Sequence, residues 1–119
     1  MKSLAESFEI VRQQIADDCA KAGRTTESVE LLAVSKTRSA DEVRAAAATG
    51  QRAFGENYLQ EAVEKIEALS ELDLEWHFIG PIQSNKTRPI AENFAWVHSV
   101  DRLKIAQRLS SQRPHYAKD

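Results

Sequence analysis

Cysteine is almost absent from this sequence, and its absence limits where the protein can be expected to work. Cys19 is the single cysteine among 119 residues, so the chain cannot form an internal disulfide. A lone thiol in an apolar helical stripe acts as a small hydrophobe, which suits a reducing compartment. The N-terminus has no basic segment followed by an apolar run, and no stretch approaches the roughly 20 apolar residues that cross a bilayer. We therefore expect a cytoplasmic protein without a membrane span.

The sequence also lacks a large excess of charge of either sign. It has 16 basic and 18 acidic residues, for a formal net charge of −2. No long-range field would gather nucleic acid, although Lys86 and Arg88 could contact an anion locally. Hydrophobic residues make up 42% of the chain and charged residues 29%, close to the averages for globular domains. At this length we expect a single domain over residues 1–119 that binds no nucleic acid.

The N-terminal segment, residues 1–24, has the pattern of one amphipathic helix. Ser3 and Glu6 have the spacing of a capping box, and Gly23 offers a left-handed stop. The apolar residues recur at steps of four and three, which is one helical face, namely Leu4, Phe8, Val11, Ile15 and Cys19.

Four repeats of a strand followed by a helix occupy the rest of the chain. Short apolar runs predict strands at residues 31–34, 52–55, 74–79 and 94–97. This alternation predicts an α/β fold with a parallel sheet and right-handed crossovers. Residues 114–119 show no pattern, and we expect this tail to fray.

Helix signals follow each predicted strand. Ser39 and Glu42 form a capping box that begins an Ala-rich helix, which Gly50 closes. In the last helix, a stripe of apolar residues should face inward, namely Leu103, Ala106 and Leu109. Apolar periodicity predicts the three later helices over residues 59–69, 84–92 and 101–111.

Lys36 follows the first strand and is the residue most suited to carry chemistry. In parallel α/β folds the functional groups gather at the carboxyl ends of strands. A lysine there can simply extend its ammonium group to solvent. Alternatively, partial desolvation lowers the pKa of the amine and leaves a nucleophile that condenses with an aldehyde. Alternation gives Lys36 the same facing as Leu32 and Val34, but the run does not decide which face is internal.

Asn57, His77 and the start of the third predicted helix also lie near this edge. Asn57 is interpreted first as a helix cap, with ligand contact as the alternative. His77 is interpreted as a packed strand histidine with one satisfied nitrogen. No Cys, Asp or second His lies at metal-ligand spacing from it, so we expect no metal site. The polar run from Ser84 to Arg88 could bind a phosphate, but polar residues are common in the first turn of helices.

Four stretches of the sequence carry a resemblance to a known family: LLAVSKTRSADEVRAAAATG, AFGENYLQEAVEKI, WHFIGPIQSNKTR and VHSVDRLKIAQRL. In order and spacing they resemble the pyridoxal-phosphate homeostasis proteins, also described as proline-synthase co-transcribed proteins, over residues 31–110. That family is similar to the N-terminal barrel domain of alanine racemase and binds pyridoxal 5'-phosphate (PLP) through one lysine. The resemblance implies that Lys36 holds PLP as a Schiff base. It also places Asn57, His77, Ile79 and Ser99 around the cofactor.

The length of the chain departs from the family pattern. Members are about twice as long, and the resemblance implies that strands five to eight and the phosphate-binding loops belong to the other half. The expected fold is therefore four units of a TIM-type barrel, a half barrel preceded by an N-terminal helix. Half a barrel exposes two strand edges and an apolar inner face. One hypothesis is a homodimer that closes an eight-stranded barrel, and another is a truncated product or a fragment.

Three functions follow from these expectations. The first is a carrier that captures PLP reversibly and delivers it to PLP-dependent client enzymes, without turnover of its own. The second is an amino-acid racemase-like enzyme, which needs acid and base groups on both cofactor faces. No tyrosine is evidently placed to supply the second group. The third is a truncated remnant that no longer binds the cofactor.

Overall fold

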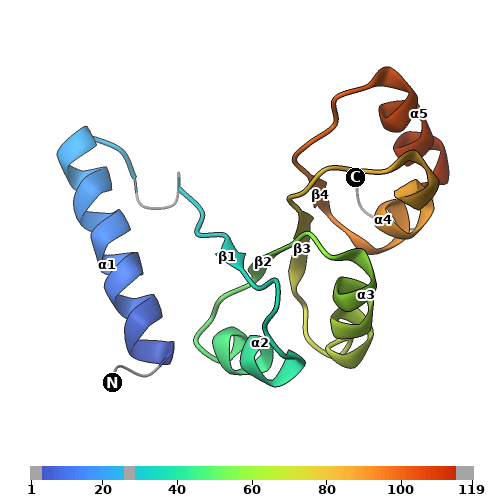
Figure 1. Ribbon diagram of the computed structural model, residues 1–119. Helices are drawn as coiled ribbons and strands as arrows, with labels where there is room; N and C mark the ends of the chain where they lie inside the picture. Colours follow the sequence, from blue (N-terminus) through green and yellow to red (C-terminus); the bar gives the residue numbers. More distant parts are fainter. Residues whose placement is uncertain (1–3, 26–28, 115–119) are drawn as a thin grey trace.

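The chain begins with one long helix and then alternates short strands with helices (Figure 1). This computed structural model describes residues 4–25 and 29–114. Ser3 of the expected first capping box and the tail from His115 to Asp119 lie outside the described residues. The elements in chain order are α1 (Leu4–Ala22), β1 (Ala33–Val34), α2 (Ala40–Ala47), β2 (Ala53–Glu56), α3 (Leu59–Ala68), β3 (Glu75–Phe78), the 3₁₀ turn η2 (Ser84–Lys86), α4 (Thr87–Asn93), β4 (Trp96–Val97) and α5 (Leu103–Gln112).

The four strands form one parallel sheet in the order β1-β2-β3-β4. Strands that follow one another in the chain are therefore neighbours in the sheet, which differs from the reversed order of a doubly wound fold. Phe54 of β2 pairs with Ala33 on one side and with Trp76 on the other. On β3 and β4, His77 pairs with Trp96. The expected α/β class with a parallel sheet is confirmed.

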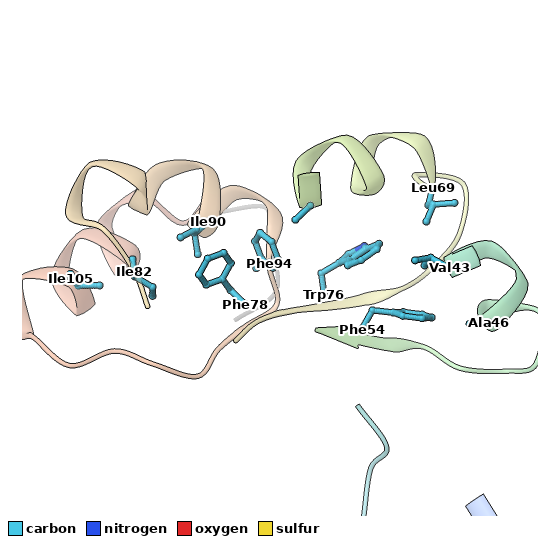
Figure 2. Close-up of a cluster of buried hydrophobic side chains, with 11 residues drawn as sticks. Val43, Ala46, Phe54, Leu69, Trp76, Phe78, Ile82, Ile90, Phe94 and Ile105 are labelled. Atoms are coloured by element: carbon cyan, nitrogen blue, oxygen red, sulfur yellow. The ribbon is translucent and has the colours of Figure 1, made fainter. Parts of the chain in front are cut away.

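The hydrophobic core lies on the face of the sheet that the helices cover. Phe54, Trp76 and Phe78 point from their strands toward the helices (Figure 2). The helices meet them with side chains that are at most 7% exposed, namely Val43, Ala46, Ala62, Leu69, Ile82, Ile90, Phe94 and Ile105, several of which lie just beyond a helix end. Burial of this kind contributes about 25 cal/mol for each Å² removed from water, so the core supplies the main stabilisation.

The opposite face of the sheet is open. Strand alternation places Val34, Gly55, His77 and Trp96 there, because they pair with one another and lie between the core residues. Val34 is 54% exposed and Trp96 is 56% exposed, which is high for large apolar side chains in a parallel sheet. The side of the sheet that carries these four residues is called the open face.

The ends of the helices follow local signals in the sequence. Ser39 caps α2 by accepting a hydrogen bond from the Glu42 backbone N–H at 3.1 Å, and the Glu42 carboxylate accepts one from the Ser39 backbone N–H at 3.3 Å. The predicted capping box is therefore confirmed. Gly23 follows α1 with a φ of +70°, and Gly50 follows α2 with a φ of +99°. Both conformations lie in the left-handed region that glycine adopts without a steric penalty.

An arginine of helix α1 donates hydrogen bonds to the segment between α2 and β2. The Arg12 guanidinium donates to the Thr49 carbonyl oxygen at 3.1 Å and to Gln51 Oε1 at 3.0 Å. Phe8 packs against the core, and Cys19 is buried, as expected of a thiol in an apolar stripe. Within the described residues, no helix is both long enough and apolar enough to cross a bilayer.

The edge strands and the last helix differ from the sequence-based expectation. β1 and β4 have two residues each instead of four, since an edge strand has a neighbour on one side only and its ladder ends early. On α5, Leu103 is 74% exposed and Ala106 is also exposed, so the predicted inward stripe was wrong for both. Ile105 is fully buried instead, and Leu109 lies one turn later against the core.

We expect Ile105→Ala to destabilise the protein much more than Leu103→Ala. Removing a fully buried isoleucine side chain leaves a cavity and costs about 2–5 kcal/mol. Leu103 is mostly exposed, so its truncation should change the free energy of unfolding by about 0.5 kcal/mol or less. Urea-induced unfolding followed by circular dichroism measures both, and equal losses would contradict this account of α5.

Candidate functional site

Four of the five residues predicted from the sequence follow the carboxyl ends of the strands. Parallel strands place their carboxyl ends together, and Lys36, Asn57, Ile79 and Ser99 follow β1, β2, β3 and β4 in turn. His77 lies inside β3 on the open face. The sheet therefore brings the five predicted positions to the same side of the molecule, while their individual environments differ.

Lys36 is exposed and lies in a turn directly after the β1–β2 ladder. The Ser35 backbone N–H donates to the Gly55 carbonyl oxygen at 2.9 Å, which continues that ladder by one residue. The Ser35 side chain is on the helix side, where its hydroxyl contacts Glu56. Thr37, the next residue after the lysine, has a φ of +66°. The chain thus leaves β1 through a tight turn that presents Lys36 to solvent.

A buried ion pair lies beneath this turn. The side chain of Lys65 on α3 is 6% exposed, and that of Glu56 on β2 is 0% exposed. The Lys65 Nζ atom donates to Glu56 Oε2 at 3.0 Å and to the Ser35 carbonyl oxygen at 2.7 Å. It also pairs with Glu61 Oε1 at 2.8 Å. These contacts join β1, β2 and α3 directly below Lys36.

Sequence reasoning missed this pair, although a signal was present. Lys65 lies three residues after Ala62 and four before Leu69, so it belongs to the buried stripe of α3. Glu56 ends a strand that is otherwise apolar. Opposite charges at two positions that patterning marks as buried predict that they pair, since a lone buried charge is very costly.

Glu61 connects the ion pair to the turn. Its Oε1 atom accepts a hydrogen bond from the Thr37 backbone N–H at 2.7 Å. The hydrogen bond from Lys65 and the one from Thr37 both favour the carboxylate and hold the pKa of Glu61 below its ordinary value of 4.5, while partial burial opposes the shift. Glu61 therefore remains an anion, and a strong acceptor, down to acidic pH.

Asn57 is not the helix cap that the sequence suggested. The N-cap of α3 is Tyr58, which directly precedes Leu59 and makes no side-chain capping bond. Asn57 instead packs against Gly80, where an added Cβ atom would lie only 2.8 Å from Asn57 Cβ. The Oδ1 atom of Asn57 is buried and has no hydrogen-bond partner. A buried acceptor without a partner is uncommon in native proteins and points to a missing donor.

His77 is buried on the open face and uses both ring nitrogens. Its Nε2 atom lies 2.7 Å from Glu75 Oε1, and its Nδ1 atom lies 2.9 Å from His98 Nε2. A carboxylate can only accept, so Nε2 carries the proton, and in the neutral ring Nδ1 accepts from His98. The ring stacks on Trp96 and on His98, with centroid distances of 6.0 Å and 5.1 Å.

The surroundings of His77 include two carboxylates. One oxygen from each of Glu30 and Glu75 and one ring nitrogen of His77 lie within 4.8 Å of one another. The sequence spacing did not indicate this cluster, nor the contact with His98. Hydrogen bonds to Glu75 and His98 already occupy both nitrogens of His77. We therefore assign the cluster to hydrogen bonding, and the absence of a metal site stays a prediction.

Ile79 and Ser99, the last two predicted residues, differ in their exposure to solvent. Ile79 is half-buried, and its Cδ1 atom would lie 3.2 Å from a Cβ atom added at Gly55. The absence of a side chain at Gly55 thus lets Ile79 and Leu32 pack over β2. Ser99 is exposed, just beyond β4. A groove of about 740 Å³ lies between the segments that follow β2 and β3 and is lined in part by Asn57, Gln83 and Lys86. Lys36, Ile79 and Ser99 are not among its lining residues.

Comparison with known proteins identifies close relatives. A pyridoxal phosphate homeostasis protein of Pseudomonas aeruginosa is 63% identical over 114 residues, which cover 96% of this chain and 50% of that protein. A protein of the same description from Escherichia coli is 51% identical and is also covered over 50% of its length. No family model matches the chain. The chain spans about half the length of the curated relatives it matches.

A solved structure extends the comparison to the fold. PipY of Synechococcus elongatus, determined with PLP bound, is 43% identical and superimposes with a TM-score of 0.80. The match covers 92% of this chain and 48% of PipY. The arrangement of strands and helices is thus shared with half of a larger protein.

The lowered pKa of Glu61 predicts an acid-dependent part of the stability. Because the pKa is lowered in the folded state, the contribution is complete above 4.5 and is lost as the pH falls through the lowered value. We expect Glu61→Gln to flatten the dependence of unfolding free energy on pH below 4.5, whereas Glu67→Gln on the same helix should not. Urea titrations across this pH range measure the slopes, and identical slopes for both variants would contradict the assignment.

Proposed function

We propose that the chain, which is 63% and 51% identical to two pyridoxal phosphate homeostasis proteins over about half of their length, binds PLP through Lys36. The observation that carries the proposal is the exposed lysine at the carboxyl end of β1, in a chain whose structural relative was solved with PLP bound. In this proposal the protein is a carrier that buffers PLP and delivers it to client enzymes without turnover of its own.

The chemistry of the bond is reversible condensation. The deprotonated Lys36 amine attacks the aldehyde carbon, a C=N bond forms, and the carbonyl oxygen leaves as water. This Schiff base needs no oxidant or other reactant, and water reverses it. Lys65 does not compete for the aldehyde, because its ammonium group is buried and held by Glu56, Glu61 and the Ser35 carbonyl.

The other residues of the edge fit an aromatic ligand with polar substituents. The unpartnered Asn57 Oδ1 atom would accept from an N–H or O–H group of the cofactor. His77 with its stacked neighbours offers a flat aromatic surface, and Ile79 offers an apolar wall. Ser99 would add a hydroxyl group at the fourth strand. The proposed binding residues are therefore Lys36, Asn57, His77, Ile79 and Ser99.

We also propose that the chain is a half barrel. Four consecutive parallel strands with all core-forming helices on one face are the arrangement of four units of a TIM-type barrel. In this proposal residues 1–119 form one partial-barrel domain in the cytoplasm, and the open face corresponds to the barrel interior. Two copies that bring their open faces and strand edges together would form the homodimer that was one of the hypotheses from the sequence.

We expect Lys36→Arg to abolish covalent capture of PLP. Arginine keeps the positive charge but does not form a stable imine, because its guanidinium stays protonated. The matched control is Lys104→Arg, which changes an exposed lysine on α5. Added PLP is followed by imine absorption, and borohydride reduction with peptide mass spectrometry locates the adduct. Loss of the band in both variants would argue against Lys36, and no band in the unmodified chain would favour the remnant hypothesis.

The homodimer makes a separate prediction about the open face. Trp96→Glu should convert a dimer into a monomer, since it replaces a large apolar side chain that is 56% exposed with a charged one. Leu103→Glu is the control, because Leu103 is 74% exposed but lies on α5. Sedimentation velocity measures the mass of each. A monodisperse monomer for the unmodified chain would overturn the homodimer proposal.

A further inference from the structure

Two side chains of α3 hold both peptide groups that flank Lys36. We propose that Lys65 and Glu61, supported by Glu56, are positioning residues that set the direction in which the Lys36 side chain leaves the backbone. The inference rests on the proposed role of Lys36 in binding an aldehyde. It goes beyond that role, because it assigns a task to three residues that would touch no ligand.

The two contacts act on different peptide planes. The Ser35 carbonyl belongs to the peptide group before Lys36 and accepts from Lys65 Nζ at 2.7 Å. The Thr37 N–H belongs to the peptide group after Lys36 and donates to Glu61 Oε1 at 2.7 Å. The rotations between these two planes are the φ and ψ angles of Lys36. Holding both planes therefore determines where its Cα–Cβ bond points.

The anchor itself has little freedom to move. An ammonium group has three protons, and three acceptor groups surround Lys65, namely the carboxylates of Glu56 and Glu61 and the Ser35 carbonyl. Lys65 and Glu56 have almost no exposed side-chain surface. Charged hydrogen bonds in a protein interior are stronger than in water. The turn therefore rests on a support that is rigid compared with an ordinary surface loop.

The conformation of Thr37 is a second, independent observation. Its φ of +66° lies in the left-handed region, which is unfavourable for a β-branched residue. Such a conformation persists only where surrounding contacts determine it, and these cases gather at functional sites. The hydrogen bond from Thr37 N–H to Glu61 supplies such a contact. A relaxed turn would direct the preceding lysine elsewhere.

The test separates positioning from general stability. Glu61→Ala removes the acceptor for Thr37 but leaves the Lys65–Glu56 pair intact, so the fold should persist. Glu61→Gln keeps an oxygen that can accept from Thr37, and Glu67→Ala makes the same change on the exposed side of α3. Each variant is incubated with PLP, reduced with borohydride, and analysed for the adduct at Lys36 by peptide mass spectrometry. Amide hydrogen exchange at Thr37 and the Lys36 HN–Hα coupling are recorded by NMR on the ligand-free chain.

We expect Glu61→Ala to weaken capture at Lys36 by about tenfold, which is the scale of one hydrogen bond to a charged group. The same variant should lose protection at the Thr37 amide and alter the Lys36 coupling. Glu61→Gln should restore all three readouts to within about twofold of the unmodified chain, and Glu67→Ala should leave them unchanged.

Two results would overturn the positioning role. One is unchanged Thr37 exchange and Lys36 coupling in Glu61→Ala, which would show that Glu61 does not hold the turn. The other is altered NMR readouts with undiminished capture, which would show that the held conformation does not matter. If the unmodified chain captures no PLP at Lys36, the proposed function fails by itself. The NMR readouts and the reductive labelling of Lys36 with formaldehyde then decide the positioning role. Labelling must weaken in Glu61→Ala, recover in Glu61→Gln and stay unchanged in Glu67→Ala.

Discussion

A buried ammonium group needs hydrogen-bond acceptors, and the acceptors around Lys65 come from three parts of the chain. Taking one partner from a buried pair costs about 3–5 kcal/mol, although the intact pair adds little net stability. Glu56 from β2, Glu61 from α3 and the Ser35 carbonyl after β1 meet the charge together. The pair therefore fixes how α3 sits against the first two strands. The Lys36 turn depends on that geometry.

The two faces of the sheet have different chemistry because successive strand residues point in opposite directions. One face packs Phe54, Trp76 and Phe78 under the helices. The other has Gly55, the Glu75–His77–His98 hydrogen bonds and two exposed apolar side chains. Lys36 continues the alternation of the open face, while its neighbour Ser35 turns to the ion pair. The division between core and candidate site is thus a consequence of strand geometry.

Much of the fold could be predicted because its signals are local. The capping box at Ser39 and Glu42 and the glycine stops at Gly23 and Gly50 need only neighbouring residues. The predictions for Asn57 and Leu103 used local signals only and were wrong, because the environments of these two residues depend on residues far away in the sequence. The packing of Asn57 depends on Gly80, and the exposure of Leu103 depends on how α5 meets α4. Local pattern does not contain those contacts.

The sequence by itself determined the alternation of strands and helices, the position of Lys36 at a strand end and the resemblance to relatives twice as long. Periodicity and turn residues carry this information along the chain. Only the tertiary structure decided which face is open, that Asn57 keeps an unpartnered oxygen and that Lys65 supports the turn. Alternation separates a strand's residues into two sets without saying which set meets the helices. A buried charge, likewise, finds its partner only when strands and helix come together.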